Sequence, residues 1–116
     1  MSDADEFYRE WHGRMNHAKA SAPEVGRAFG GMYQALMKEG ALSVREKELI
    51  SLAISMALRC EPCIYVHAEK ALKVGATREQ IMEMAGVVVT MQGGPGYTYI
   101  PKLVEALDSV GSRSQG

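Results

Sequence analysis

Both cysteines of the chain lie in one short stretch, RCEPCIYVHAEK, which spans residues 59–70. Cys60 and Cys63 are separated by two residues, and His67 follows four residues after the second cysteine. Pro62 suits an early helical position, so we expect a helix to begin at Cys60. Cys63 and His67 are then one turn apart, and both cysteines share a helical face with the imidazole. This spacing is typical of two working thiols with a base beside them.

The start of a helix is a favourable place for a thiolate. Free backbone N–H groups and the helix dipole stabilise negative charge there. A neutral imidazole can take the proton of a thiol, and the imidazolium then stabilises the thiolate. The two sulfurs can form and break a disulfide without large backbone motion. The dipole favours Cys60 as the attacking thiol and the nearby base favours Cys63, so the residues alone leave this choice open.

The cysteine pair could also have one of three different roles. A structural disulfide across CxxC would close a loop too short to constrain the unfolded chain. Two buried thiols without a role would be packing residues. A zinc site could use Cys60, Cys63 and His67, but a fourth ligand is missing. His12 and His17 are five residues apart in the first predicted helix, so they point to different faces and are interpreted as surface or packing residues. We therefore expect neither a metal nor another cofactor.

A carboxylate would complete the arrangement by orienting the imidazole and balancing its charge. The candidate is Glu48, in a predicted helix that is apolar over most of its circumference; its polar residues line one face and are Glu48, Ser51, Ser55 and Arg59. Straight helices place Glu48 about 18 Å, and His67 about 10 Å, from Cys60 along the two axes. A gap of about 8 Å would remain for side chains and water to span unless the helices cross steeply. The alternative is that Glu48 is a surface or interface carboxylate.

Helix signals dominate the chain, and strand signals are nearly absent. Apolar residues at helical spacing and two capping boxes (SVRE and TREQ) predict about six helices. They span about residues 3–19, 23–38, 44–58, 60–74 and 78–91, with a last helix from about residue 100. QGGPGY is expected to end the fifth predicted helix before the last helix begins. The third predicted helix should be buried at the centre of the domain or in an oligomer interface.

The second predicted helix carries its own apolar stripe, whose residues we expect to face inward: Val25, Phe29, Met32 and Leu36. Gly26 and Gly30 lie four residues apart, which would permit another helix to approach closely. We expect residues 1–110 to form one compact all-α domain, a helical bundle, and residues 111–116 to form a frayed tail.

The composition excludes several classes of protein. A net charge of −1 over 116 residues gives no electrostatic footprint for nucleic acid or for an anionic membrane. No segment approaches the roughly 18 apolar residues of a membrane span. The start, MSDADEFYRE, does not resemble a signal or transit peptide, so we expect a cytoplasmic protein. In that compartment a close cysteine pair is catalytic or metal-binding more often than structural.

With Glu48 included, the pattern reads E-x11-C-x2-C-x3-H. It resembles the motif of the alkylhydroperoxidase D-like (AhpD-like) proteins within the carboxymuconolactone decarboxylase superfamily. The segment REKELISLAISMALRCEPCIYVHAEKALKVGATREQIMEM is similar to that family's central block, so the resemblance covers about residues 40–92. It implies an all-helical, obligately oligomeric fold, commonly a trimer or hexamer, with thiol-based peroxidase or disulfide reductase activity.

The resemblance also implies a role for each residue. Cys63 corresponds to the peroxide-attacking cysteine and Cys60 to the resolving one, while His67 and Glu48 correspond to the proton relay. The implied reductant is a dithiol, such as a lipoyl-bearing partner protein. The sequence departs from the best-characterised relatives at Pro62, where they carry a second histidine. Because C-x-P-C is similar to thioredoxin-type pairs, this departure favours general disulfide reduction.

The sequence therefore predicts a thiol-dependent peroxidase or disulfide reductase with an antioxidant role, acting on a hydroperoxide or a disulfide. One alternative is a non-catalytic oligomeric module for redox sensing or binding, which the apolar third helix and the eight methionines would suit. The other is a carboxymuconolactone decarboxylase-like enzyme, although that branch of the superfamily lacks the cysteine pair.

Overall fold

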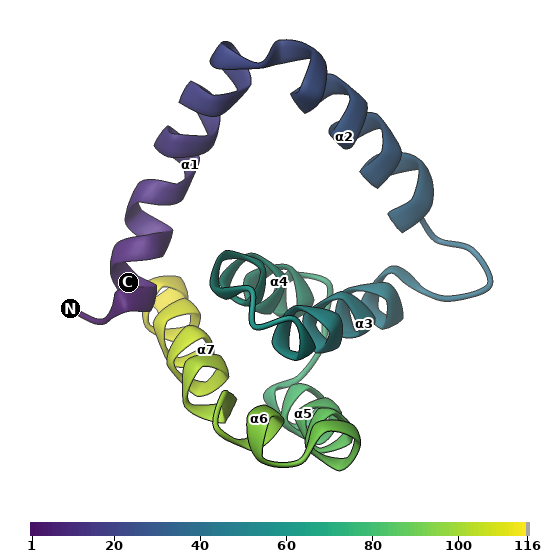
Figure 1. Cartoon of the computed structure of the whole chain (residues 1–116), viewed down its shortest axis with the longest axis vertical. Coiled ribbons are helices and arrows are strands. Elements are labelled where there is room, and N and C mark those ends of the chain that lie inside the picture. The colour runs from purple at the N-terminus through teal and green to yellow at the C-terminus, as the bar shows by residue number, and fades with distance from the viewer. Residues whose placement is uncertain (116) are drawn as a thin grey trace.

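The computed structural model describes residues 1–115, with side chains to residue 113, and its regular structure there is entirely helical (Figure 1). The helices are α1 (Asp3–Ser21), α2 (Pro23–Met37), α3 (Val44–Ala57), α4 (Glu61–Lys73), α5 (Arg78–Gln92), α6 (Gly94–Tyr97) and α7 (Ile100–Gln115). The prediction of an all-α fold is confirmed, and the predicted ends of α1 to α5 agree to within about two residues. No helix in the described part of the chain is both long and apolar enough to cross a membrane.

The predicted capping boxes start two of these helices. Ser43 caps α3 by accepting the N–H of Glu46, whose carboxylate accepts the N–H of Ser43 in return. Thr77 and Gln80 make the same reciprocal pair at the start of α5. These side chains satisfy backbone donors that a helix start leaves unpaired, which explains why the boundaries could be predicted.

The single-turn helix α6 forms where the sequence predicts only a break. The Tyr97 N–H donates to the carbonyl of Gly93 at 3.1 Å, and Gly93 itself has a positive φ of 70°. A Cβ at Gly96 would lie 3.2 Å from the Val88 carbonyl oxygen and 3.3 Å from the Val89 Cα. A side chain at this position would push α6 and α5 apart by a few tenths of an ångström, so glycine favours their close packing.

The core lies where α3 and α4 pack on each other and against α5 and α7. Its largest fully buried side chains come from all four helices: Leu52, Met56, Ile64, Ile81 and Leu103. The N-terminal half of α1 joins this core through Ala4 and Tyr8, whose hydroxyl donates to the Tyr65 carbonyl at 2.5 Å. We call α3, α4, α5, α6 and α7 the body of the molecule.

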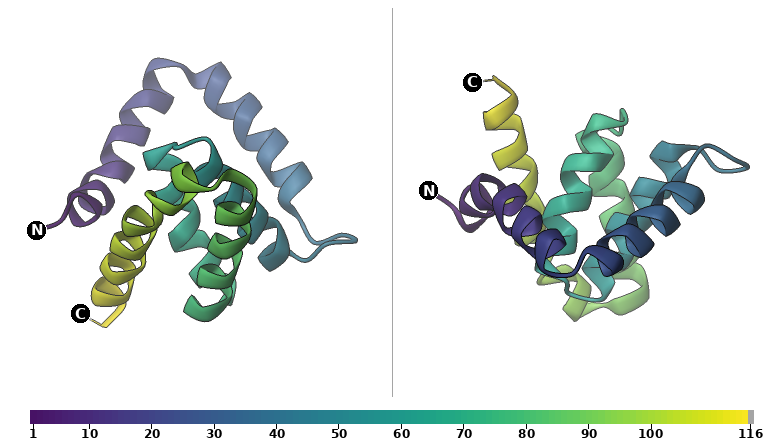
Figure 2. Two further views of the ribbon diagram at one scale, coloured as in Figure 1. Left: turned by 60° about the horizontal axis from the view of Figure 1, so that its bottom comes forward. Right: turned by 90° about the horizontal axis from the view of Figure 1, so that it is seen from above.

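Helices α1 and α2 form an arch over the body. Figure 1 shows α1 rising away from α7 and α2 returning toward α3, and the left view of Figure 2 shows the same inverted V. The two helices turn at Ala22, whose N–H still donates to the Ala18 carbonyl at 2.9 Å. None of the α2 residues is buried in the single chain.

The predicted inward stripe of α2 is wrong for the single chain. These side chains are exposed: Val25 (69%), Phe29 (61%), Met32 (52%) and Leu36 (65%). The face that α2 turns toward the body is rotated by one residue and is only half-buried; it consists of Gly26, Gly30, Tyr33 and Met37. Periodicity located the apolar stripe correctly, but it could not determine which face the body would cover.

The paired glycines of α2 do not bring a second helix of the chain into close contact. A Cβ at Gly30 would meet no heavy atom within 4 Å, and one at Gly26 would meet the Lys19 side chain at an ordinary 3.4 Å. The prediction of a close helix approach at these positions is therefore wrong within the single chain. Instead, both glycines leave open space beneath the arch.

Helix α7 runs beyond the boundary that the sequence predicts for it. Residues 111–115 are helical, where a frayed tail is expected from residue 111. The Arg113 guanidinium donates to the Glu69 carboxylate at 2.7 Å and lies 4.2 Å from the centre of the Tyr8 ring. These contacts hold the last turns against α4 and α1. The final residue of the predicted tail, residue 116, lies outside the described residues.

Candidate active site

The end of α3 places the cysteine pair beside the helix that carries Glu48. Arg59 has a positive φ of 54°, its N–H donates to the Met56 carbonyl, and the Cys60 N–H donates to the Ser55 carbonyl, both at 3.0 Å. This is the Schellman arrangement, with arginine at the left-handed position that glycine usually takes. The chain reverses within three residues, so α4 starts close to α3.

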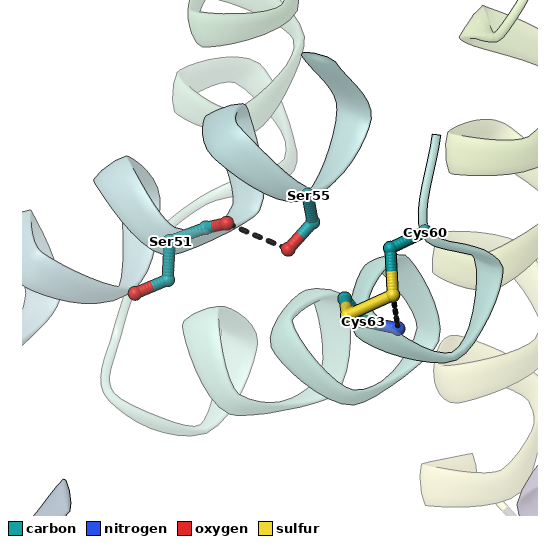
Figure 3. The surroundings of a disulfide bond; sticks show 4 residues. All are labelled: Ser51, Ser55, Cys60 and Cys63. Carbon is teal, nitrogen blue, oxygen red and sulfur yellow. Dashed lines mark hydrogen bonds between the residues drawn. A yellow bond between two sulfur atoms is a disulfide. The ribbon is translucent and has the colours of Figure 1, made fainter. Parts of the chain in front are cut away.

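Cys60 is the N-cap of α4, as the sequence predicts, and its sulfur accepts the Cys63 N–H at 3.3 Å. The two cysteines form a disulfide with their Cα atoms 5.2 Å apart, so the pair is in its oxidised state. Figure 3 shows this bond in the first turn of α4, beneath Ser51 and Ser55 of α3. Both cysteines are half-buried, and the helix start can stabilise either thiolate once the bond is reduced.

Glu48 and His67 are in direct contact. Oε1 of Glu48 lies 2.7 Å from Nδ1 of His67, and the glutamate is only 3% exposed. The expected gap of about 8 Å between straight helices is therefore closed by the two side chains alone. They point toward each other across the α3–α4 contact, so no bridging water is needed. The alternative of a surface carboxylate is wrong.

Tyr33 is a further member of this site that the sequence did not indicate. Its hydroxyl donates to Oε2 of Glu48 at 2.6 Å, so each oxygen of the carboxylate has its own partner. Tyr33 comes from α2 in the arch, while Glu48 and His67 come from the body. No spacing in the sequence connects Tyr33 with the motif, because the contact exists only once α2 is folded back over α4.

The protonation states of Glu48 and Tyr33 follow from their burial and from the hydrogen bonds between them and with His67. Burial raises the pKa of Glu48, but the bonds from His67 and Tyr33 outweigh burial, so the pKa ends below its usual range. Burial raises the pKa of Tyr33, and the bond to the Glu48 carboxylate raises it further, so the phenol stays protonated and donates. Because Glu48 is ionised, Nδ1 of His67 carries the proton in their bond, and Nε2 is left to accept one.

The remaining polar residues on this face of α3 make local contacts. The Ser51 hydroxyl donates to the Lys47 carbonyl at 2.8 Å, and the Ser55 hydroxyl donates to the Ser51 carbonyl at 2.7 Å, as Figure 3 shows for the second bond. The Arg59 guanidinium lies 5.7 Å from the centre of the Tyr99 ring. Only Glu48 from this face reaches His67.

A groove of about 620 Å³ opens beneath the arch, between α1, α2 and α4. Cys63 and His67 line it, whereas Cys60 does not. His12 also lines the groove and His17 does not, and both are exposed, as expected of surface residues. Among the described residues, no three His, Cys, Asp or Glu side chains are arranged to hold a metal ion. Because Cys63 lines the groove and Cys60 does not, a molecule in the groove would meet the sulfur of Cys63.

Comparison with known proteins identifies the family of the chain. The model of the carboxymuconolactone decarboxylase family matches residues 23–106, which run from the start of α2 into α7. The chain belongs to the carboxymuconolactone decarboxylase family. The resemblance drawn from the cysteine motif is confirmed at this level. The family match includes Tyr33, Glu48, both cysteines and His67, and leaves out the whole of α1.

Relatives within the family support the whole fold. An uncharacterised protein of Cupriavidus necator is 35% identical over 76% of this chain and 78% of its own length. A family protein of Legionella pneumophila, known from its crystal structure, matches 94% of this chain and 98% of its own with a TM-score of 0.87 and 33% identity. A family protein of Thermotoga maritima, for which a role in the antioxidative response is suggested, matches 78% and 93% with a TM-score of 0.71 and 27% identity.

Proposed function

We propose that this protein is a thiol-dependent peroxidase that also reduces disulfides, with an antioxidant role. The observation that carries the proposal is the contact of His67 with a buried, ionised Glu48 at 2.7 Å, one helical turn from Cys63. A structural disulfide would need no base, and the carboxylate holds the imidazole ready to take a proton. The antioxidative role suggested for the Thermotoga relative is consistent with this proposal.

The cycle begins with the reduced pair. His67 takes the proton of the Cys63 thiol, and the thiolate attacks one oxygen of a hydroperoxide. The O–O bond breaks, the sulfur becomes a sulfenic acid, and the leaving alkoxide takes the proton back from His67 and departs as an alcohol. The Cys60 thiol then attacks the sulfenic sulfur, the S–O bond breaks, and water leaves. The product is the Cys60–Cys63 disulfide, the state present in the structure.

A dithiol restores the reduced pair by two thiol–disulfide exchanges and is itself oxidised to a disulfide. A lipoyl-bearing protein would supply such a dithiol. Pro62, at the exposed rim of the helix start, takes the place of a second proton carrier, so His67 alone moves the proton in this chain. This arrangement also suits disulfide substrates, which require a thiolate but less proton transfer.

The direct test measures consumption of cumene hydroperoxide and of hydrogen peroxide with dihydrolipoamide as reductant. Cys63→Ser is expected to abolish turnover, and Cys60→Ser to stop after one equivalent with a trappable sulfenic acid. His67→Gln should lower kcat/KM about 10²-fold. Its matched control is His17→Gln, an exposed histidine outside the groove, which should behave as wild type.

Two results would overturn the proposal. If the wild-type protein turns over no peroxide and no disulfide faster than Cys63→Ser, it is a redox-sensing or binding module. If activity survives Cys63→Ser but is lost with His67→Gln, the chemistry does not pass through the thiols, and a decarboxylase-like reaction becomes the favoured function.

We further infer that the protein works as a homo-oligomer, a trimer or a hexamer. Besides the exposed apolar stripe of α2, helix α3 also exposes large apolar side chains: Ile50, Ile54 and Leu58. Large apolar side chains exposed on two helices in this way are typical of an interface between protein chains. Light scattering should give a mass several times that of the chain, and Ile54→Lys should lower it. A wild-type protein that stays monomeric at micromolar concentration would contradict this.

A further inference from the structure

The groove beneath the arch is much larger than the peroxide bond requires. Its volume of about 620 Å³ lies within the range of small-molecule sites. Trp11 and Met15 of α1, Phe29 of α2 and Val66 of α4 give it predominantly apolar walls. Hydrogen peroxide at Cys63 would contact almost none of this surface. The walls therefore favour a molecule with a sizeable apolar part.

The charge of the groove has one sign. Lys19 and Lys70 line the groove, and no aspartate or glutamate does. Neither lysine forms an ion pair with any residue in the described part of the chain. The Lys70 ammonium lies 4.1 Å from the centre of the Tyr33 ring, and both oxygens of nearby Glu48 are engaged by other partners. Lys70 also acts electrostatically on the Glu48 carboxylate, but that carboxylate is buried, so the Lys70 ammonium is the charged group that an anion in the groove would meet.

The position of Lys70 relative to the sulfur of Cys63 sets the distance between the anionic end and the reacting atoms of a bound molecule. Cys63, His67 and Lys70 lie on one face of α4, and seven residues separate the cysteine from the lysine. Seven helical residues correspond to about 10 Å along the axis. A molecule whose anionic end lies at Lys70 would therefore present atoms to Cys63 about 10 Å along its chain.

We propose that the groove binds an elongated apolar molecule with one anionic end group, in the manner of a fatty-acid hydroperoxide. Lys70 faces the anion, the apolar chain lies along Val66, Trp11 and Phe29, and the O–O bond lies at Cys63. The peroxide part of this inference rests on the proposed function. The binding part does not, because an unreactive fatty acid has the same chain and the same charge.

Trp11 provides a direct readout, since it is the single tryptophan of the chain and lines the groove. Titration with decanoate should change its fluorescence in a saturable way. Decanol, which has the same chain without the charge, should bind about fivefold more weakly. Lys70→Gln should weaken decanoate binding by about the same factor and leave decanol binding unchanged. Lys73→Gln, on the same helix but outside the groove, is the matched control.

A second pair of variants blocks the groove. A Cβ at either Gly30 or Gly31 would meet no heavy atom within 4 Å, but only Gly30 lines the groove. Both substitutions to leucine improve helix propensity, so both proteins should fold. Gly30→Leu should weaken decanoate binding about tenfold or more and lower kcat/KM for a fatty-acid hydroperoxide by a larger factor than for hydrogen peroxide. Gly31→Leu should do neither.

The outcomes separate this inference from the proposed function. Saturable decanoate binding that is lost in Gly30→Leu supports the inference, even if no peroxide is consumed and the proposed function fails. Turnover of hydrogen peroxide with no saturable decanoate binding overturns it while leaving the function intact. Equal affinity for decanoate and decanol overturns the role of the charge. Trp11 fluorescence that changes with protein concentration and resists decanoate would show that a second copy fills the groove, and would also overturn it.

Discussion

The body and the arch use amphipathic helices in opposite ways. In the body, α3 and α4 bury their apolar residues against each other, and this contact holds Glu48 against His67. In the arch, α2 carries an apolar stripe of similar length, yet none of its residues is buried. It is attached to α3 by polar contacts instead: the Tyr33–Glu48 bond and the Lys47 ammonium, which donates to the carbonyls of Leu36 and Lys38 at 2.9 and 2.7 Å.

The body and the arch therefore use their apolar residues for different tasks. Apolar burial fixes the geometry of the relay inside one chain, whereas the apolar surface of α2 remains available to the groove and to other copies. The comparison can be tested with substitutions that should act on one region and not on the other.

The largest effect is expected from truncating matched leucines. Leu52 of α3 is fully buried and Leu36 of α2 is 65% exposed. Leu52→Ala should lower the free energy of unfolding by about 3 kcal/mol, because it removes buried contacts and leaves a cavity. Leu36→Ala should cost less than about 0.5 kcal/mol in the monomer and weaken self-association instead. Denaturant titrations at several protein concentrations would check both expectations. If the two variants lost the same free energy of unfolding at low protein concentration, the comparison would be contradicted.

Within the body, Glu48→Gln should lower kcat/KM about 10²-fold, since an amide cannot balance the charge of the imidazolium. The pH dependence of stability should also change. The pKa of Glu48 is lower in the folded state, so its contribution is complete above the ordinary glutamate pKa and is lost as the pH falls through the folded value. Acid unfolding followed by circular dichroism should thus be less steep in Glu48→Gln.

The matched control for that substitution is Glu83→Gln, an exposed carboxylate on α5. It should change neither activity nor the acid transition. A Glu48→Gln enzyme with wild-type kcat/KM would show that the carboxylate is structural only.

The contact between the two regions should have an intermediate effect. Tyr33→Phe removes one of the two donors to Glu48 and should lower kcat/KM about tenfold, with the pKa of the Cys63 thiol raised because the relay is less well oriented. Thiolate absorbance of the reduced protein against pH measures that pKa without requiring turnover. Tyr97→Phe, at an exposed tyrosine of α6, is the control. An unchanged thiol pKa in Tyr33→Phe would mean that the arch does not influence the relay.

The smallest effect concerns the reversal between α3 and α4. Arg59 adopts a left-handed conformation, with φ of 54°. Arg59→Gly should be as stable as wild type to within about 0.5 kcal/mol, because relief of strain offsets the lost contact with Tyr99 and the added freedom of the unfolded chain. Arg59→Val should lose about 1 kcal/mol, since a β-branched residue tolerates this conformation poorly. Thermal unfolding would distinguish the two variants. If Arg59→Val were as stable as wild type, residue 59 would not be constrained to the left-handed conformation.

The sequence alone determined the features that depend on near neighbours in the chain. The starts of α3 and α5 followed from capping boxes, and Cys60 was placed at the start of α4 because Pro62 suits an early helical position. The spacing of Cys60, Cys63 and His67 indicated thiol chemistry because helical periodicity alone puts them on one face. The family resemblance rested on the same local pattern.

Tertiary structure decided what depends on how far and at what angle helices approach. Helical rise alone left Glu48 and His67 about 8 Å apart, and only the packing of side chains across α3 and α4 brought them into contact. Tyr33 joined them because the turn at Ala22 folds α2 back over α4. The same turn left the stripe from Val25 to Leu36 exposed. A periodic pattern fixes which residues share a face, but the contacts between elements determine what covers that face.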